Sequence, residues 1–241
     1  MTSSFLRLGL AAALVLSAGL SLRADSAPAV VFAKDYANEA PGDAVSELPN
    51  FIVWTGAPQG SWGEAKIVAP PAAIPDSPKA ALLFTSNAAT PKTFAPSVTV
   101  KTPDFGAKGK GKGTYRLRFA IPVDGPYRAD FFFGGSWESN GAIVIFQNGG
   151  ISLMQKSGKD YTPLRIGEYE ANKWQELKVS FDFEKKTCSL TYNGKSVANE
   201  IPWNNPKLTS FPDLTLAAGF DPGASSGLPL FYLHQLEVLQ E

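Results

Sequence analysis

The stretch from Gly134 to Gly141, with the sequence GGSWESNG, places an indole ring beside a carboxylate and an amide. An aromatic ring can stack on the apolar face of a sugar, while Glu138 and Asn140 can hydrogen-bond its hydroxyl groups. Loops of this composition carry binding residues more often than the strands they connect. The stretch therefore predicts a ligand-binding loop centred on Trp137, with the alternative that Trp137 folds back to cap the core.

Four further side chains are candidate ligand contacts. Arg116 and Arg118 fall on the polar face of one predicted strand and could bind carboxylated or sulfated sugars. Tyr161, in GKDYTP, and Trp203, in IPWNNP, are aromatic residues in loop-like segments. The alternatives are a solvated strand face for the two arginines and a place in the core for the two aromatic residues.

The only histidine, His234, limits base catalysis and metal binding. It alternates with Tyr232, Leu236 and Val238, which predicts a place on the apolar face of the last strand. A buried, hydrogen-bonded imidazole is favoured there over a general base. No G-x-S-x-G elbow is present to supply a serine nucleophile, and one histidine with one cysteine cannot build a zinc site of the Cys/His kind.

These candidates lie between short apolar runs that are typical of β-strands. Each run is rich in β-branched or aromatic residues and is bounded by Gly, Pro, Asn or Asp. The predicted strands cover residues 64–69, 80–85, 97–101, 114–121, 129–134, 141–147, 150–155, 177–183, 188–194, 214–220 and 230–239.

The pattern within the strands predicts an all-β fold. Tyr115, Leu117 and Phe119 fall on one strand face and Arg116 and Arg118 on the other, so one face is buried and one is wet. The 22 glycines and 19 prolines interrupt the sequence too often for long helices. We therefore expect a two-sheet antiparallel β-sandwich, with surface loops at the Pro/Ala-rich segment 69–80 and the Gly/Lys-rich segment 106–113.

The N-terminal residues are typical of a secretory signal peptide. Arg7 precedes the apolar run 8–22, and small residues at positions 24 and 26 suit signal peptidase. We expect residues 1–26 to be removed and residues 27–241 to form a single domain that is secreted or periplasmic. The one cysteine lies far from the cleavage region, so no lipid anchor is expected, and the 22 basic and 22 acidic residues argue against nucleic-acid binding.

The segment from Ala171 to Val197 predicts three antiparallel strands, with a polar turn near Glu184 and a type I′ turn at Asn193-Gly194. Its order, a Trp that opens one strand and Tyr-Asn-Gly that ends the next, resembles laminin-G-like and other concanavalin A-like lectin/glucanase jelly rolls. The segments FYLHQLEV and VVFAKDYANEAPGD are similar to the last and first strands of secreted bacterial members. The resemblance implies a jelly roll with adjacent first and last strands, and it favours a core position for Trp174.

The resemblance also directs attention to glycan cleavage and to calcium. Glucanases of this superfamily carry an E-x-D-x-x-E pattern, which is absent here. The pairs Glu168/Glu170 and Asp182/Glu184 are favoured as solvated strand-end charges. In related bacterial jelly rolls the position of His234 is commonly Asp, so a structural calcium held by Asp35 and Glu39 is only weakly supported and no cofactor is expected.

The sequence thus favours a secreted, non-catalytic jelly roll that binds an extracellular glycan or polysaccharide. One alternative is a glycan-cleaving enzyme, a hydrolase or lyase, with an unfamiliar carboxylate arrangement. Another is a structural or adhesive surface protein with no small ligand.

Overall fold

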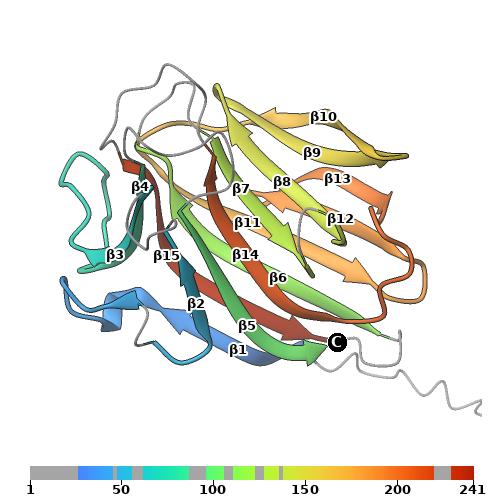
Figure 1. The fold of residues 1–241 in the computed structure, drawn as a ribbon, viewed down its shortest axis with the longest axis horizontal. Coiled ribbons are helices and arrows are strands. Elements are labelled where there is room, and N and C mark those ends of the chain that lie inside the picture. The colour runs from blue at the N-terminus through green and yellow to red at the C-terminus, as the bar shows by residue number, and fades with distance from the viewer. Residues whose placement is uncertain are drawn as a thin grey trace, which may run out of the picture.

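Two antiparallel β-sheets packed face to face make up the structure, a computed structural model that describes residues 27–45, 48–55, 62–86, 96–105, 111–122, 128–135, 138–219 and 229–241. Figure 1 shows one sheet in front of the other, with the strands of both sheets running in similar directions. The predicted all-β sandwich is confirmed. A 3₁₀ turn, η1 (Tyr36–Asn38), is the helical element in this part of the chain.

The larger sheet, called sheet A, has eight strands. The hydrogen-bonded order is β13-β12-β11-β6-β15-β4-β3, and β1 also pairs with β15. In chain order the strands of sheet A are β1 (Ala29–Asp35), β3 (Gly63–Val68), β4 (Ala81–Ser86), β6 (Lys112–Ala120), β11 (Trp174–Asp182), β12 (Thr187–Tyr192), β13 (Lys195–Pro202) and β15 (Pro229–Gln240).

The smaller sheet, called sheet B, has seven strands in the order β10-β9-β8-β7-β14-β5-β2. In chain order these are β2 (Phe51–Trp54), β5 (Ser97–Phe105), β7 (Arg128–Phe133), β8 (Ala142–Gln147), β9 (Gly150–Ser157), β10 (Asp160–Glu168) and β14 (Phe211–Gly219). Across the described residues, none of the helical structure is long and apolar enough to cross a membrane.

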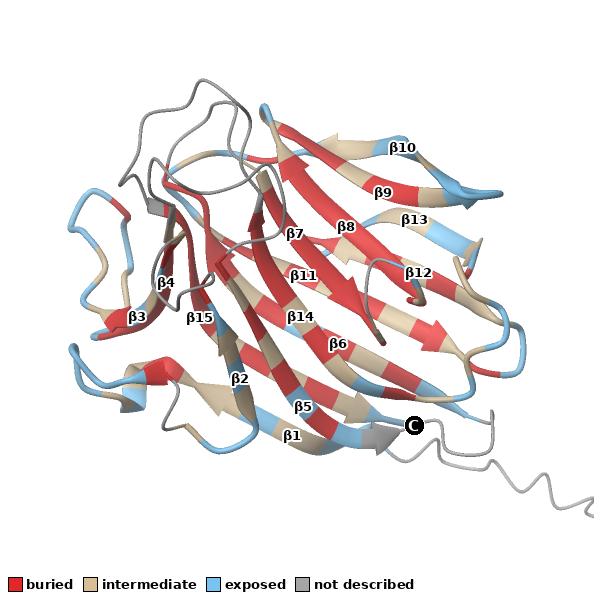
Figure 2. Cartoon of the chain, viewed as in Figure 1, coloured by how far each residue is buried: buried red, intermediate tan, exposed pale blue. Residues whose placement is uncertain are grey.

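Aromatic rings fill the space between the sheets. Phe119 of sheet A packs edge-on against Phe131 and Phe146 of sheet B, with ring centroids 5.2 and 4.8 Å apart. Figure 2 shows buried segments concentrated in the middle strands of both sheets, and exposed segments along β10 and β13. Because each buried large apolar side chain is worth about 1.5 to 3 kcal/mol, this layer is the main source of stability.

The first and last strands are adjacent, as the resemblance implied. β1 pairs antiparallel with the C-terminal half of β15, so that Val30 lies opposite Leu239 and Asp35 opposite Gln235. The predicted meander is also present, because β11 pairs with β12 and β12 pairs with β13. Asn193 and Gly194 have φ values of 46° and 77°, as a type I′ turn requires.

Three local predictions differ from the structure. Strands β2 and β10 were not predicted, because β2 has four residues and β10 is an edge strand that contains Pro163. Strand β11 pairs with β6 in unbroken register, so Trp174 and Leu177 lie on opposite faces. Trp174 instead points to the outer face of sheet A, where it packs on a satellite cluster that contains Tyr232, outside the core between the sheets.

The face of His234 was also predicted wrongly. The β15–β6 register shifts between Leu233 and Gln235, which is a β-bulge centred on His234. The bulge moves Leu236 and Val238 onto the inner face with Leu233 and leaves His234 beside Trp174, with ring centroids 5.6 Å apart.

The buried thiol of Cys188 gives a direct test of the β12 facing. Its side chain is 2% exposed in the core, and burial raises the pKa of the thiol to about 12. We therefore expect a thiol-reactive dye at pH 8 to label the native protein slowly and the denatured protein rapidly, because the thiolate is the reacting species. Rapid labelling of the native protein would show that β12 presents its opposite face to the core.

Candidate functional site

A cleft of about 420 Å³ opens beside the loop that sequence analysis singled out. Gly134, Gly135 and Ser139 of that loop form one wall, and the segment leading into β14 forms the other. This second wall supplies Lys207, Thr209, Ser210 and Asp213, together with Leu208 and Pro212. The cleft therefore offers hydroxyl groups, one cation, one carboxylate and glycine backbone to a polar ligand.

The glycine wall has a conformation that other residues would not allow. Gly134 has φ 72°, and a Cβ there would lie 2.1 Å from the ring of Phe211. Gly135 has φ 139°, and a Cβ there would lie 2.0 Å from the backbone oxygen of Ser139. Without a side chain, Gly134 lets the loop follow the Phe211 ring closely, and Gly135 lets it approach the backbone of Ser139.

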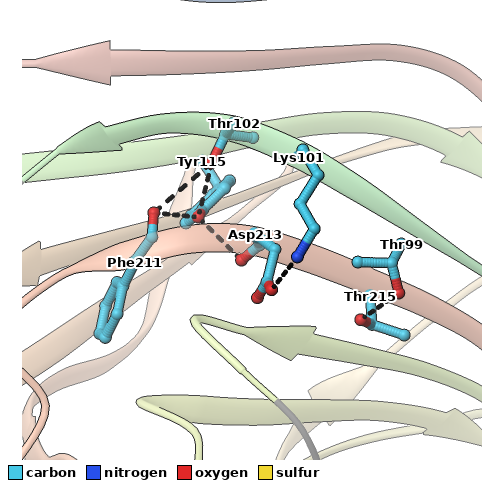
Figure 3. A network of polar contacts seen from close by, with 7 residues as sticks. All are labelled: Thr99, Lys101, Thr102, Tyr115, Phe211, Asp213 and Thr215. Carbon is cyan, nitrogen blue, oxygen red and sulfur yellow. Dashed lines mark hydrogen bonds and ion pairs between the residues drawn. The ribbon is translucent and has the colours of Figure 1, made fainter. Parts of the chain in front are cut away.

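Asp213 is the charged group that ties the cleft to sheet B. Figure 3 shows its Oδ2 accepting a hydrogen bond from Lys101 Nζ at 3.1 Å, while its backbone oxygen accepts from Tyr115 Oη at 3.1 Å. Its Oδ1 is buried and has no hydrogen-bond partner among the described residues. A buried carboxylate oxygen without a donor is unfavourable.

The predicted binding loop divides into different roles. Glu138 is exposed, and its backbone oxygen accepts a hydrogen bond from Lys156 Nζ at 2.8 Å. Asn140 is fully buried: its Nδ2 donates to Tyr161 Oη at 3.1 Å and its Oδ1 accepts from Asn204 Nδ2 at 2.9 Å. Asn140 and Tyr161 thus hold the loop base against the neighbouring strands. Trp137 lies outside the described residues.

The two arginines lie on the outer face of sheet A and not at the cleft. Arg116 pairs with Glu176 at 2.7 Å and with Glu237 at 3.3 Å, and the hydrogen bond that it donates to Glu176 is the main cause that raises the pKa of Arg116. The guanidinium of Arg118 lies over the Trp174 ring, 6.0 Å from its centroid. These contacts match the solvated-face alternative more closely than an anion-binding role.

Trp203 is a correction to the predicted ligand contacts. Its side chain is 4% exposed and packs against Phe181, Phe183 and Phe211 in the core. Lys186 covers the ring from outside, with Nζ 4.7 Å from the centroid. The ring is therefore closed to a sugar, because both of its faces already have protein partners.

The residues considered for calcium have protein partners. Glu39 forms an ion pair with Lys34. Asp35 accepts hydrogen bonds from Gln235 Nε2 at 2.9 Å and from the backbone of Ala37, and it lies 3.3 Å from His234 Nε2. No group of three or more metal-ligating side chains occurs within the described ranges. The Asp35–His234 contact thus joins the first strand to the last.

Asp130 is the one fully buried carboxylate in the described part of the chain. It lies on the outer face of sheet B, where Arg128 Nε donates to both carboxylate oxygens at 2.7 and 3.0 Å. Burial raises the pKa of Asp130 to about 6, against the opposing effect of Arg128. Asp130 lies opposite Ala217, four residues along β14 from Asp213, so the two carboxylates are about 14 Å apart.

That separation argues against a glycosidase pair, whose carboxyl groups stand roughly 5 to 9.5 Å apart. The acidic pairs noted in the sequence do not supply an alternative. Glu168 pairs with Arg165, and Glu170 pairs with Lys173. Asp182 Oδ1 accepts from the backbone of Glu184 in the β11–β12 turn, which makes it a turn residue.

Sequence analysis missed an aromatic pair formed by Trp54, on the edge strand β2, and Trp62, just before β3. Trp54 is 42% exposed, and the Trp62 ring packs edge-on against it with centroids 4.9 Å apart. The available signal was the alternation in FIVW: Phe51 and Val53 pack on the core, so Ile52 and Trp54 must point outward.

We predict that Asn140→Ala lowers the free energy of unfolding by about 1 to 3 kcal/mol, because it removes a fully buried amide that donates a hydrogen bond to Tyr161 and accepts one from Asn204. Urea denaturation would measure the change. Asn199→Ala is the matched control, since that exposed side chain has one hydrogen bond, to Ser189. Equal stability of the two variants would mean that the Asn140 network does not hold the loop.

A second prediction concerns pH and Asp130. The folded protein keeps this carboxyl protonated up to about pH 6, whereas the unfolded chain releases the proton near pH 4. The folded state therefore gains about 1 kcal/mol from this group as pH falls from 7 to 5. Asp130→Asn should remove that gain in urea titrations at both pH values, whereas the exposed Asp160→Asn should retain it. An unchanged pH dependence in Asp130→Asn would contradict the prediction.

Comparison with known proteins supports the fold. No protein-family model and no curated protein matches the sequence. Similar solved structures include a sialidase, with a TM-score of 0.59 and 11% sequence identity. The match covers 88% of this chain but only 18% of the sialidase chain. A carbohydrate esterase from Shiga toxin-encoding bacteriophage phi24B has a TM-score of 0.59 and 12% sequence identity. That match covers 89% of this chain and 100% of the esterase chain. An endo-β-1,4-glucuronan lyase from Trichoderma reesei has a TM-score of 0.54 and 11% sequence identity. That match covers 88% of this chain and 96% of the lyase chain. Several structural neighbours are thus carbohydrate-active proteins, and at these identities the likeness is one of fold.

Proposed function

We propose that this chain is a carbohydrate-binding protein whose ligand occupies the cleft between loop 134–141 and the segment 207–213. The observation that carries the proposal is Asp213, a carboxylate at the cleft wall that is 16% exposed and paired with Lys101 through Oδ2. Sugar hydroxyl groups are donors of the required kind, and Thr209, Ser210 and Lys207 add further partners.

Binding without cleavage is the favoured form of this function. The two carboxylates on sheet B stand too far apart to act on one glycosidic bond. His234, the single histidine, is 7% exposed and pairs with Asp35 on the outer face of the other sheet. Burial lowers the pKa of His234, which favours the neutral imidazole of a structural contact.

Glycan cleavage is the second candidate, and the structural neighbours favour it. A sialidase, a carbohydrate esterase and a glucuronan lyase all have similar folds. A reducing-end assay on each bound glycan distinguishes binding alone from cleavage. If neither binding nor cleavage is detected, a structural or adhesive role is supported.

We further infer that the chain is a concanavalin A-like jelly roll that is secreted or periplasmic. The adjacency of β1 and β15 and the β11–β12–β13 meander support the first inference. The apolar N-terminal segment within residues 1–26, which lies outside the described residues, supports the second. Trp137, which lies outside the described residues, and Glu138 remain proposed ligand contacts.

The deciding experiment begins with a glycan array probed with residues 27–241 and continues with titration calorimetry on the bound glycan. Asp213→Asn should weaken binding about 10- to 100-fold, the loss expected when a charged hydrogen bond of about 1.5 to 3 kcal/mol is removed. Its melting temperature should change little, because Lys101, its ion-pair partner, is half exposed.

Glu184→Gln is the matched control. It removes an exposed carboxylate in the β11–β12 turn of the other sheet and should keep wild-type affinity. Full glycan affinity in Asp213→Asn would remove the cleft as the binding site.

A further inference from the structure

The exposed indole of Trp54 has the properties of a stacking platform. It lies at the end of edge strand β2 and is 42% exposed. The Trp62 ring meets it at an interplanar angle of 88°, so contact from Trp62 restrains its orientation. A restrained, partly exposed aromatic ring can bind the apolar face of a ligand ring with little loss of side-chain entropy.

The sheet surface between Trp54 and the cleft is lined by small side chains that carry hydroxyl groups. Trp54 lies opposite Ser97 on β5, and Thr99 follows on the same face. Thr99 lies opposite Thr215 on β14, and the two hydroxyl groups are 2.9 Å apart, as Figure 3 shows. Each hydroxyl keeps hydrogen-bonding capacity beyond this contact, and none of these side chains is large enough to block a ligand that lies along the face.

This surface leads into the cleft. Lys101 follows Thr99 on the same face of β5 and pairs with Asp213, which lines the cleft. The register places Trp54 two strands across and four residues along from Asp213, a separation of about 16 Å. We call the outward side chains of Trp54, Ser97, Thr99, Thr215, Lys101 and Asp213 the sheet B strip.

We propose that the sheet B strip binds an extended, uncharged polysaccharide chain that runs from the cleft to a stacking position on Trp54. The inference rests on the proposed function, because the cleft anchors one end of the chain. A span of about 16 Å exceeds one sugar ring, so the expected ligand is a polymer and not a terminal sugar. The strip is electrically balanced, since its one cation and one anion pair with each other, and this favours an uncharged glycan.

The test is titration of a glycan series, from disaccharide to octasaccharide, prepared from a neutral polysaccharide that the array identifies. Wild-type affinity should rise with chain length and then level off once the chain reaches Trp54. Trp54→Ala should lower the affinity for the longest oligomers about tenfold and leave the shortest oligomers unaffected. Ile52→Ala is the matched control, because Ile52 is on the same face of β2 and 54% exposed but has no ring to stack.

The outcomes separate the inference from the proposed function. If Asp213→Asn weakens binding at every length while Trp54→Ala weakens only long oligomers, both stand. If Trp54→Ala has wild-type affinity for oligomers of every length, or if only charged glycans bind, the proposal for the sheet B strip is contradicted. The proposal for the cleft is then unaffected. If Trp54→Ala abolishes binding at all lengths and Asp213→Asn has no effect, the cleft is not the anchor and both proposals fail. Melting temperatures identify any variant that loses its fold.

Discussion

The packing of the Phe211 ring between the two sheets is the contact on which both the core and the candidate site depend. The ring meets Phe181 of sheet A edge-on, with centroids 4.4 Å apart, and it also touches Trp203. Gly134 and Gly141 pass so close to it that neither could carry a Cβ. The Phe211 ring, which joins the two sheets, therefore also sets the path of the loop at Gly134. Packing in the core thus determines the shape of the cleft.

The outer faces of the two sheets differ in how far their side chains are used by the protein itself. On sheet A, Arg116 pairs with two glutamates, and Trp174 is in contact with Arg118 and His234. On sheet B, hydroxyl groups and one indole remain open to solvent near a cleft. A candidate binding surface is therefore recognised by side chains that are free to contact a ligand. Charged or aromatic side chains that already contact other protein groups are typical of a structural surface.

The sequence predicted the fold well because strand alternation and turn chemistry are local. Tyr115, Leu117 and Phe119 face the core as expected, and Asn193-Gly194 makes the expected turn. The errors arose where tertiary structure overrides the local pattern. A bulge at His234 changed the facing of β15, and Trp203 in a proline-flanked segment proved to be core. The cleft wall at 207–213 has no motif, because its residues meet the loop 134–141 only in the folded protein, where Gly134 N donates to the backbone oxygen of Asp213.

The position of β15 in sheet A has a consequence for how the chain acquires its fold. Residues 229–240 form the strand that pairs with β6 on one side and with β4 and then β1 on the other. Until these last residues leave the ribosome, β6 and β4 have no shared partner and the edges that β15 will cover stay open. Sheet A can therefore close only after residues 229–240 have been synthesised, and its long-range pairings should make folding slow. Sheet B does not contain β15, so its strands can pair before sheet A is complete.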